Sequence, residues 1–104
     1  MKLNNIFAEI PDELDNELVQ VLQQSDNIKI QRIVSKGQVS PETGWYDQQQ
    51  NEWVIVIKGE AVIAFEQTEV AMQAGSYINI PAHTKHKVSW THPDIETIWL
   101  VVYY

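Results

Sequence analysis

The most informative segment of the chain reads Gly75-Ser76-Tyr77-Ile78-Asn79-Ile80-Pro81-Ala82-His83-Thr84-Lys85-His86. Gly75 permits a tight turn that a side chain would obstruct, and a short β-rich run follows it. Pro81 cannot donate a hydrogen bond to a sheet, so it marks the end or the edge of that strand. This spacing predicts that His86 begins the next strand, close to the place where several strand ends converge.

On both sides of this segment the chain consists of short apolar runs separated by turn residues. We expect strands at 28–34, 52–57, 60–66, 69–72, 76–80, 86–91 and 96–104. Lys58-Gly59 separates two of these runs and predicts a hairpin in which the glycine takes a positive φ. Seven or eight short strands at this spacing indicate a closed β-barrel or sandwich.

The first part of the sequence has a different texture and predicts the one helix, from about residue 12 to 24. Pro11 suits a first helical turn, and the acidic residues that follow favour the positive end of the helix dipole. An apolar stripe then recurs at helical spacing, through Leu14, Leu18, Val21 and Leu22. We therefore expect residues 1–27 to be an extension and helix packed on a barrel of residues 28–104, in one structural domain.

Composition excludes several classes of protein. The chain has 104 residues, seven Lys plus Arg against fourteen Asp plus Glu, a net charge of −7 and no cysteine. Disulfide scaffolds and thiolate metal sites are excluded, and a chain without a basic face is not expected to bind nucleic acid. The longest apolar runs, 53–57 and 98–104, fall short of the ~20 residues that a membrane-spanning helix needs. No membrane association is expected, and cytoplasmic residence is the default.

Two half-motifs in this order resemble the paired motifs of the cupin superfamily. The second cupin motif is a glycine, five residues, a proline, any residue, a glycine, two residues and a histidine. Gly75, Pro81 and His86 fall on its positions, while His83 stands at the second glycine. Glu52 and Gly59 match the end of the first motif. The resemblance covers roughly residues 28–104 and implies an all-β, cupin-like double-stranded β-helix, or jelly-roll barrel, here with the short N-terminal helix added.

The resemblance also implies a metal site, because typical cupins hold iron, manganese, nickel or zinc with three histidines and one glutamate. Glu52 and His86 match two of these ligands, and the other two histidines are missing. Their places fall on Trp45 and Asp47 or, in the alternative alignment, on Tyr46 and Gln48. Asp47 would complete an oxygen-rich set acceptable to iron, manganese or zinc, whereas a set with Gln48 would be weaker.

Each of these residues also has a plainer interpretation. His86 could be a hydrogen-bonded barrel histidine without a ligand role, and a register change of one residue would turn Glu52 to solvent. The two candidates for moving a proton are Tyr46 and His83. Some small cupins are labelled sugar-phosphate isomerase-like, but phosphate recognition normally needs Arg or Lys, and Arg32 is the one arginine here.

These observations predict a small cupin-domain protein of unassigned activity that binds a divalent metal and a small polar ligand in the barrel cavity. The alternative is a module without metal or catalysis, which binds a small ligand or serves in dimerisation. In either case we expect a homodimer, and if the barrel serves as a dimerisation scaffold, Ile98 to Tyr104 would pair strand to strand across a two-fold axis.

The negative charge is unevenly distributed along the sequence. Residues 1–26 hold six acidic side chains against Lys2, and residues 27–104 hold eight against six basic ones. The acidity is thus expected to belong mainly to the N-terminal helix and to say little about the ligand.

Overall fold

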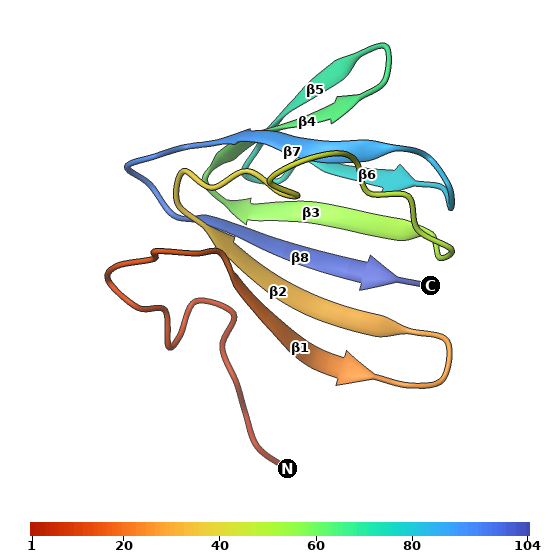
Figure 1. Cartoon of the computed structure of the whole chain (residues 1–104). Coiled ribbons are helices and arrows are strands. Elements are labelled where there is room, and N and C mark those ends of the chain that lie inside the picture. The colour runs from red at the N-terminus through yellow and green to blue at the C-terminus, as the bar shows by residue number, and fades with distance from the viewer.

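A computed structural model describes all 104 residues of the chain. It contains eight strands and no helix (Figure 1). The strands are β1 (Leu18–Gln24), β2 (Lys29–Ser35), β3 (Glu52–Lys58), β4 (Glu60–Phe65), β5 (Glu69–Gln73), β6 (Tyr77–Ile80), β7 (His86–Thr91) and β8 (Thr97–Tyr103). No helix is present that could cross a membrane.

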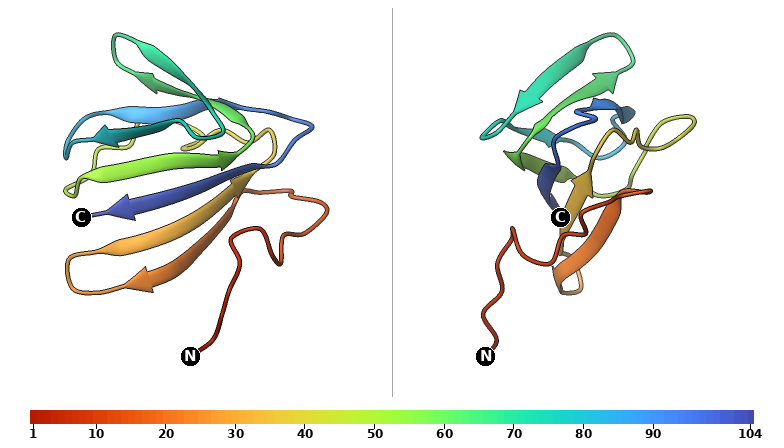
Figure 2. Two further views of the ribbon diagram at one scale, coloured as in Figure 1. Left: turned by 180° about the vertical axis from the view of Figure 1, so that it is seen from behind. Right: turned by 90° about the vertical axis from the view of Figure 1, so that its left-hand side faces the viewer.

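The strands form two antiparallel sheets that face each other, as Figure 2 shows from two further sides. The larger sheet has the order β1-β2-β8-β3-β6, and the smaller has the order β5-β4-β7. Between them lies a core of eight apolar side chains supplied by both sheets: Val54, Val56, Ala61, Ile63, Met72, Ile80, Trp99 and Val101. This two-sheet architecture confirms the all-β, jelly-roll expectation.

The predicted helix at residues 12–24 is wrong, because Leu18–Gln24 forms strand β1 at the edge of the larger sheet. β1 pairs antiparallel with β2, with a register irregularity between Val21 and Gln23. The apolar spacing that suggested a helical stripe leaves Val21 and Leu22 exposed. Non-local pairing to β2 therefore overrides a weak local helical preference.

The residues before β1 are held onto the sheet by Arg32, which is 4% exposed. Its Nη1 donates to the carbonyl oxygens of Ile6 and Ala8, and its Nε donates to the Gln20 side chain. Gln38 adds a second attachment by donating to the Leu14 carbonyl. The N-terminal segment is thereby fixed along the larger sheet, and the guanidinium divides its hydrogen bonds between this segment and Gln20 of β1.

Gly59 has the expected positive φ, of 95°, but the predicted hairpin around it is wrong. β3 belongs to the larger sheet and β4 to the smaller, so Gly59 makes a corner between the sheets. A Cβ at this position would lie 2.5 Å from Thr97 Oγ1 and 2.6 Å from the Glu96 carbonyl oxygen. Both the positive φ and this close approach require glycine here.

β8 occupies the centre of the larger sheet, between β2 and β3. Its register runs from Thr97 opposite Ser35 to Tyr103 opposite Lys29, and its other edge pairs with β3. Because both edges are already hydrogen-bonded, β8 cannot pair with a second molecule. The expected mode of dimerisation through Ile98 to Tyr104 is therefore wrong, although dimerisation itself stays a prediction.

Candidate functional site

A cavity of about 50 Å³ lies between the two sheets. Apolar side chains such as Ile33, Val54 and Trp99 form much of its wall. Its polar lining comes from Glu17, Ser35, Ser40, Tyr46, Glu52, His86 and Tyr103. These residues belong to both sheets and to the connections between strands, so the fold is what brings them together.

One wall of the cavity carries a buried histidine–carboxylate pair. Glu52 is the first residue of β3 and His86 the first of β7, and His86 Nε2 lies 3.2 Å from Glu52 Oε1. The side chains are 5% and 12% exposed. His86 Nδ1 lies 2.8 Å from the Thr84 carbonyl oxygen, so both ring nitrogens have a partner. Glu52 and His86 therefore lie next to each other, as their match to two ligand positions of one site predicts.

Opposing effects act on the pKa of His86. Burial lowers it, but the hydrogen bonds that the imidazole makes to the Glu52 carboxylate and to the Thr84 carbonyl, together with the charge of Glu52, outweigh burial and raise it above 6.5. The raised pKa favours an imidazolium paired with a carboxylate at this wall.

A second polar group was not predicted from the sequence. Glu17 immediately precedes β1, and its Oε1 accepts a hydrogen bond of 3.1 Å from the Ser40 hydroxyl. That hydroxyl also hydrogen-bonds to the Tyr46 phenol. Burial raises the pKa of Glu17, and the Ser40 hydrogen bond only partly opposes the rise. No sequence pattern distinguishes Glu17, because in the erroneous helix it is one of several acidic residues on the surface.

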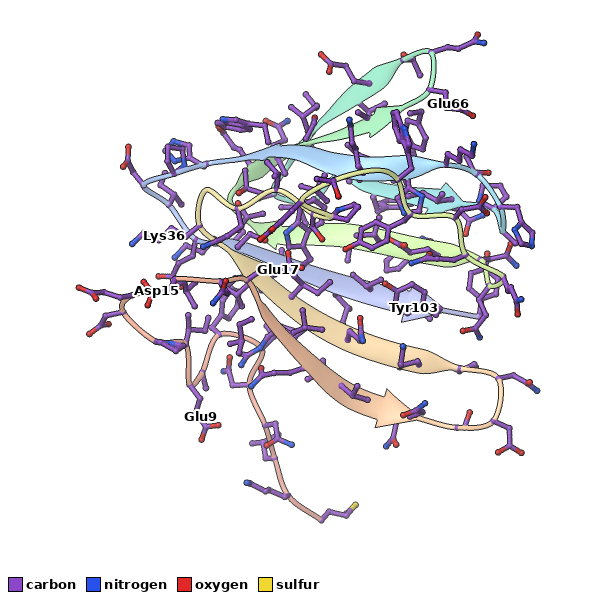
Figure 3. The ribbon with its side chains drawn as sticks, in the orientation of Figure 1. Glu9, Asp15, Glu17, Lys36, Glu66 and Tyr103 are labelled. Atoms are coloured by element: carbon purple, nitrogen blue, oxygen red, sulfur yellow. The ribbon has the colours of Figure 1, made fainter.

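Tyr103, near the end of β8, is the other polar lining residue that sequence reasoning missed. Burial raises the pKa of its phenol, and the charge of Glu52 raises it further, while the Gln48 side chain opposes the rise through a hydrogen bond. Tyr103 is therefore a neutral hydroxyl within the cavity. Its labelled position in Figure 3 is at the opposite end of the larger sheet from Glu17.

The segment before β3 places its side chains alternately inside and outside. Tyr46 pairs with His86 through the backbone and lines the cavity, with its ring centroid 5.7 Å from that of His86. Gln48 is the residue that meets Tyr103. Trp45 instead lies on the surface, where the Lys87 ammonium sits 4.4 Å from its ring centroid. Of the two alignments, the one on Tyr46 and Gln48 thus occupies inward positions.

Asp47 and His83 meet each other outside the cavity. His83 Nδ1 lies 2.9 Å from Asp47 Oδ1, and the side chains are 66% and 45% exposed. His83 has a φ of 61°, in the left-handed region that favours glycine. This explains why a glycine is expected at that position of the motif: the turn keeps the glycine conformation even with a histidine in it.

The side chains at the cavity do not fit the metal centre that the resemblance implies. Glu52 and His86 are the two metal-type ligands that lie together, and no group of three or more His, Asp or Glu side chains could hold an ion. Every buried side-chain nitrogen and oxygen already has a hydrogen-bond partner, so none is left over to point at a cation. Protein sites for iron, manganese, nickel or zinc normally supply at least three ligands.

Comparisons with known proteins agree with the fold. A protein from Ralstonia eutropha JMP134, provisionally named a mannose-6-phosphate isomerase, is 40% identical, with a TM-score of 0.93 over 99% of this chain and 97% of that one. A cupin superfamily protein from Desulfitobacterium hafniense DCB-2 has 20% identity and a TM-score of 0.75, covering 90% and 82% of the two chains.

A conserved protein of unknown function from Streptococcus pyogenes has 24% identity and a TM-score of 0.75, covering 98% of this chain and 86% of its own. No curated protein matches the sequence. The family model for the cupin domain matches residues 32–103, which span the strands from β2 to β8. The chain therefore belongs to the cupin family.

Proposed function

We propose that this cupin binds a small polar molecule in the cavity between its sheets, through its own side chains and without a metal ion. One observation carries the proposal: a largely apolar cavity is lined by a few hydroxyl, imidazole and carboxylate groups from both sheets. A small number of placed polar groups in an apolar wall is typical of ligand sites. Binding without a metal is supported by the side chains that could act as ligands. Only two of them, Glu52 and His86, lie together, and they are hydrogen-bonded to each other.

The cavity limits the size of the ligand. A volume of about 50 Å³, at roughly 10–15 Å³ for each water, holds a few waters or a molecule of about four heavy atoms. A hexose phosphate is several times larger. A ligand of that size would need the sheets or the N-terminal segment to move apart.

The lining also disfavours phosphate. Neither lysine nor arginine lines the cavity, and two carboxylates do. Arg32 is fully engaged with the N-terminal segment and the Gln20 side chain. Phosphate sites rely on Arg, Lys or clustered backbone N–H groups, so the name of the Ralstonia protein is not carried over to this chain.

Binding is tested by recording NMR shifts of the chelator-treated protein during titration with a panel of neutral and charged molecules of three to five heavy atoms. We expect saturable shifts at residues of the cavity, and the same affinity after addition of zinc, manganese, iron or nickel. Tyr46→Phe removes a lining hydroxyl and should weaken binding, whereas Tyr77→Phe, on an exposed tyrosine, is the matched control. Binding that requires metal, or no binding by any member of the panel, would contradict the proposal.

A second proposal concerns the outer face of the larger sheet, which we propose is covered by a second copy of the chain. β3 and β8 are apolar on both faces, a pattern typical of strands buried on both sides. Opposite the cavity, Trp53 pairs with Val102 and Ile55 with Leu100, and the 67%-exposed Tyr77 stacks on Trp53. In a dimer with a two-fold axis, this patch on one subunit would contact the same patch on the other subunit.

Sedimentation at micromolar concentration tests this arrangement, with a dimer as the expected species. Leu100→Glu should give monomers, and Glu66→Gln, at the far tip of the β4–β5 hairpin (Figure 3), should leave the dimer intact. A parent protein that sediments as a monomer would end the proposal.

A further inference from the structure

The two carboxylates of the cavity differ in what balances their charge. Glu52 is paired with His86, whose raised pKa favours the imidazolium form. Glu17 has only the neutral Ser40 hydroxyl, and no Lys, Arg or His nitrogen lies within 4.0 Å of it. The cavity therefore holds one carboxylate paired with a histidine and one further carboxylate with no basic partner.

The rest of the lining suits a positive charge and opposes a negative one. His86 is the single basic side chain in the wall, and it is already matched by Glu52. Three aromatic side chains line the same space: Tyr46, Trp99 and Tyr103. Aromatic rings attract cations through their electron-rich faces, so they would add to the attraction of the carboxylate.

Glu17 also stands where a ligand would enter. Glu17 and Ser40 line both the inner cavity and a second, open cleft formed with Asp15, Asn16 and the 37–42 segment. Figure 3 shows Glu17 where the N-terminal segment joins the sheets, with Asp15 and Lys36 nearby at the same end of the molecule. A molecule that passes from the open cleft to the cavity meets the Glu17 carboxylate first.

From these observations we infer that the ligand carries a single positive charge and that Glu17 selects it, as an amine-bearing molecule whose ammonium group binds this carboxylate. The inference rests on the proposed binding function and adds the charge of the ligand to it. Burial already raises the pKa of Glu17, so holding the charge there is costly without a partner. An ammonium group within hydrogen-bond reach would relieve that cost.

The test compares three molecules of nearly equal size: n-propylammonium, propan-1-ol and propionate. NMR titrations of the whole chain measure their affinities for the parent protein, with potassium chloride as a further arm. We expect propylammonium to bind about tenfold or more tightly than propan-1-ol, since hydrogen bonds to charged groups are the stronger ones. Propionate and potassium ions should give no shifts at the cavity.

The variant Glu17→Gln keeps the shape of the side chain and removes its charge. It should lower the affinity for propylammonium about tenfold and leave that for propan-1-ol unchanged. Glu42→Gln is the matched control, because Glu42 lines the open cleft but not the cavity, and it should retain the parent's preference.

The outcomes separate this inference from the proposed function. Equal affinities for propylammonium and propan-1-ol in the parent, or tightest binding by propionate or potassium, overturn the inference and leave small-molecule binding standing. An unchanged preference in Glu17→Gln overturns the role of Glu17. Absence of binding by all of these molecules and by the neutral panel overturns both, and the parent titrations decide this whether or not the variant folds.

Discussion

Two histidine–carboxylate pairs lie near one loop of this cupin, and they differ mainly in burial. The inner pair, His86 with Glu52, has the longer N–O separation, 3.2 Å, with side chains 5% and 12% exposed. The outer pair, His83 with Asp47, is closer, at 2.9 Å, but its side chains are 66% and 45% exposed. Water screens the outer pair, so the shorter distance does not make it the stronger contributor. Environment, more than separation, decides what such a pair does.

The largest effect should come from breaking the inner pair. Glu52→Ala leaves His86 buried without its carboxylate, and loss of one partner of a buried pair typically costs about 3–5 kcal/mol. Urea denaturation measures the change in unfolding free energy. Asp47→Ala makes the equivalent change in the outer pair and should cost at most about 1 kcal/mol. Equal losses in the two variants would show that burial does not distinguish the pairs.

A metal site can be added to the inner pair but not to the outer one. Tyr46→His puts an imidazole in the cavity wall next to His86, and Gln48→His puts a second one next to Tyr103, which pairs with Glu52 across the sheet. Zinc at one hundred times its dissociation constant should then raise the unfolding free energy by about 2.7 kcal/mol, because it binds only the folded state. Calorimetric zinc titration and thermal melts measure the gain.

The matched control for this gain is Trp45→His with Asp47→His, which places the same two imidazoles at outward positions. Neither this variant nor the parent should be stabilised by zinc. Stabilisation of the outward variant as large as that of the inward one would show that the inner wall is not the better site.

The cavity should also give stability a characteristic dependence on pH. The pKa values of Glu17 and His86 are raised in the folded chain, above 4.5 and 6.5, so the folded state binds more protons than the unfolded state. Each group's contribution to the free energy of unfolding is fully present at a pH below its pKa in the unfolded chain. That contribution is lost as the pH rises through its pKa in the folded chain.

Urea denaturation between pH 4 and 8 measures this dependence. Glu17→Gln should remove the part of the decrease in unfolding free energy that occurs at the lower pH values. His86→Gln should remove the part that occurs at the higher pH values. A rise in stability with pH across the same range, unchanged by either substitution, would contradict the assigned directions.

The smallest effect is expected in the outer pair. His83→Gly removes the hydrogen bond with Asp47 but also relieves a left-handed backbone conformation, which costs a residue with a Cβ about 1–2 kcal/mol. The two changes oppose each other, so stability should stay constant or rise by about 1 kcal/mol. Thermal denaturation measures it, and a loss comparable to that of Glu52→Ala would give the outer pair a structural importance that its exposure does not suggest.

The inner pair could be predicted from the sequence because local spacing determines it. Gly75, Pro81 and His86 lie in one short segment, and Glu52 begins a clear apolar run. Alternation along a strand then fixes which way each side chain points. Seven of the eight strands were expected for the same reason.

Glu17 could not be predicted, because its position depends on the pairing of β1 with β2, which is set by distant residues. Arg32 and Gln20 join across that pairing, while the local spacing of Leu14 and Leu18 fits a helix equally well. The prediction of a hairpin at Gly59, where the structure has a corner between the sheets, was wrong for a related reason. A glycine with positive φ is apparent from the sequence, but the sheet that the chain enters after it is not.

The central position of β8 has a consequence for how the barrel folds. The strand that joins β2 to β3 comes after the seven other strands along the chain, so the larger sheet cannot close until β8 has been synthesised. Until then β2 and β3 both present unpaired backbone groups, which are templates for aggregation. Assembly should accordingly be slow for a chain of this size, since each contact of β8 closes a long loop.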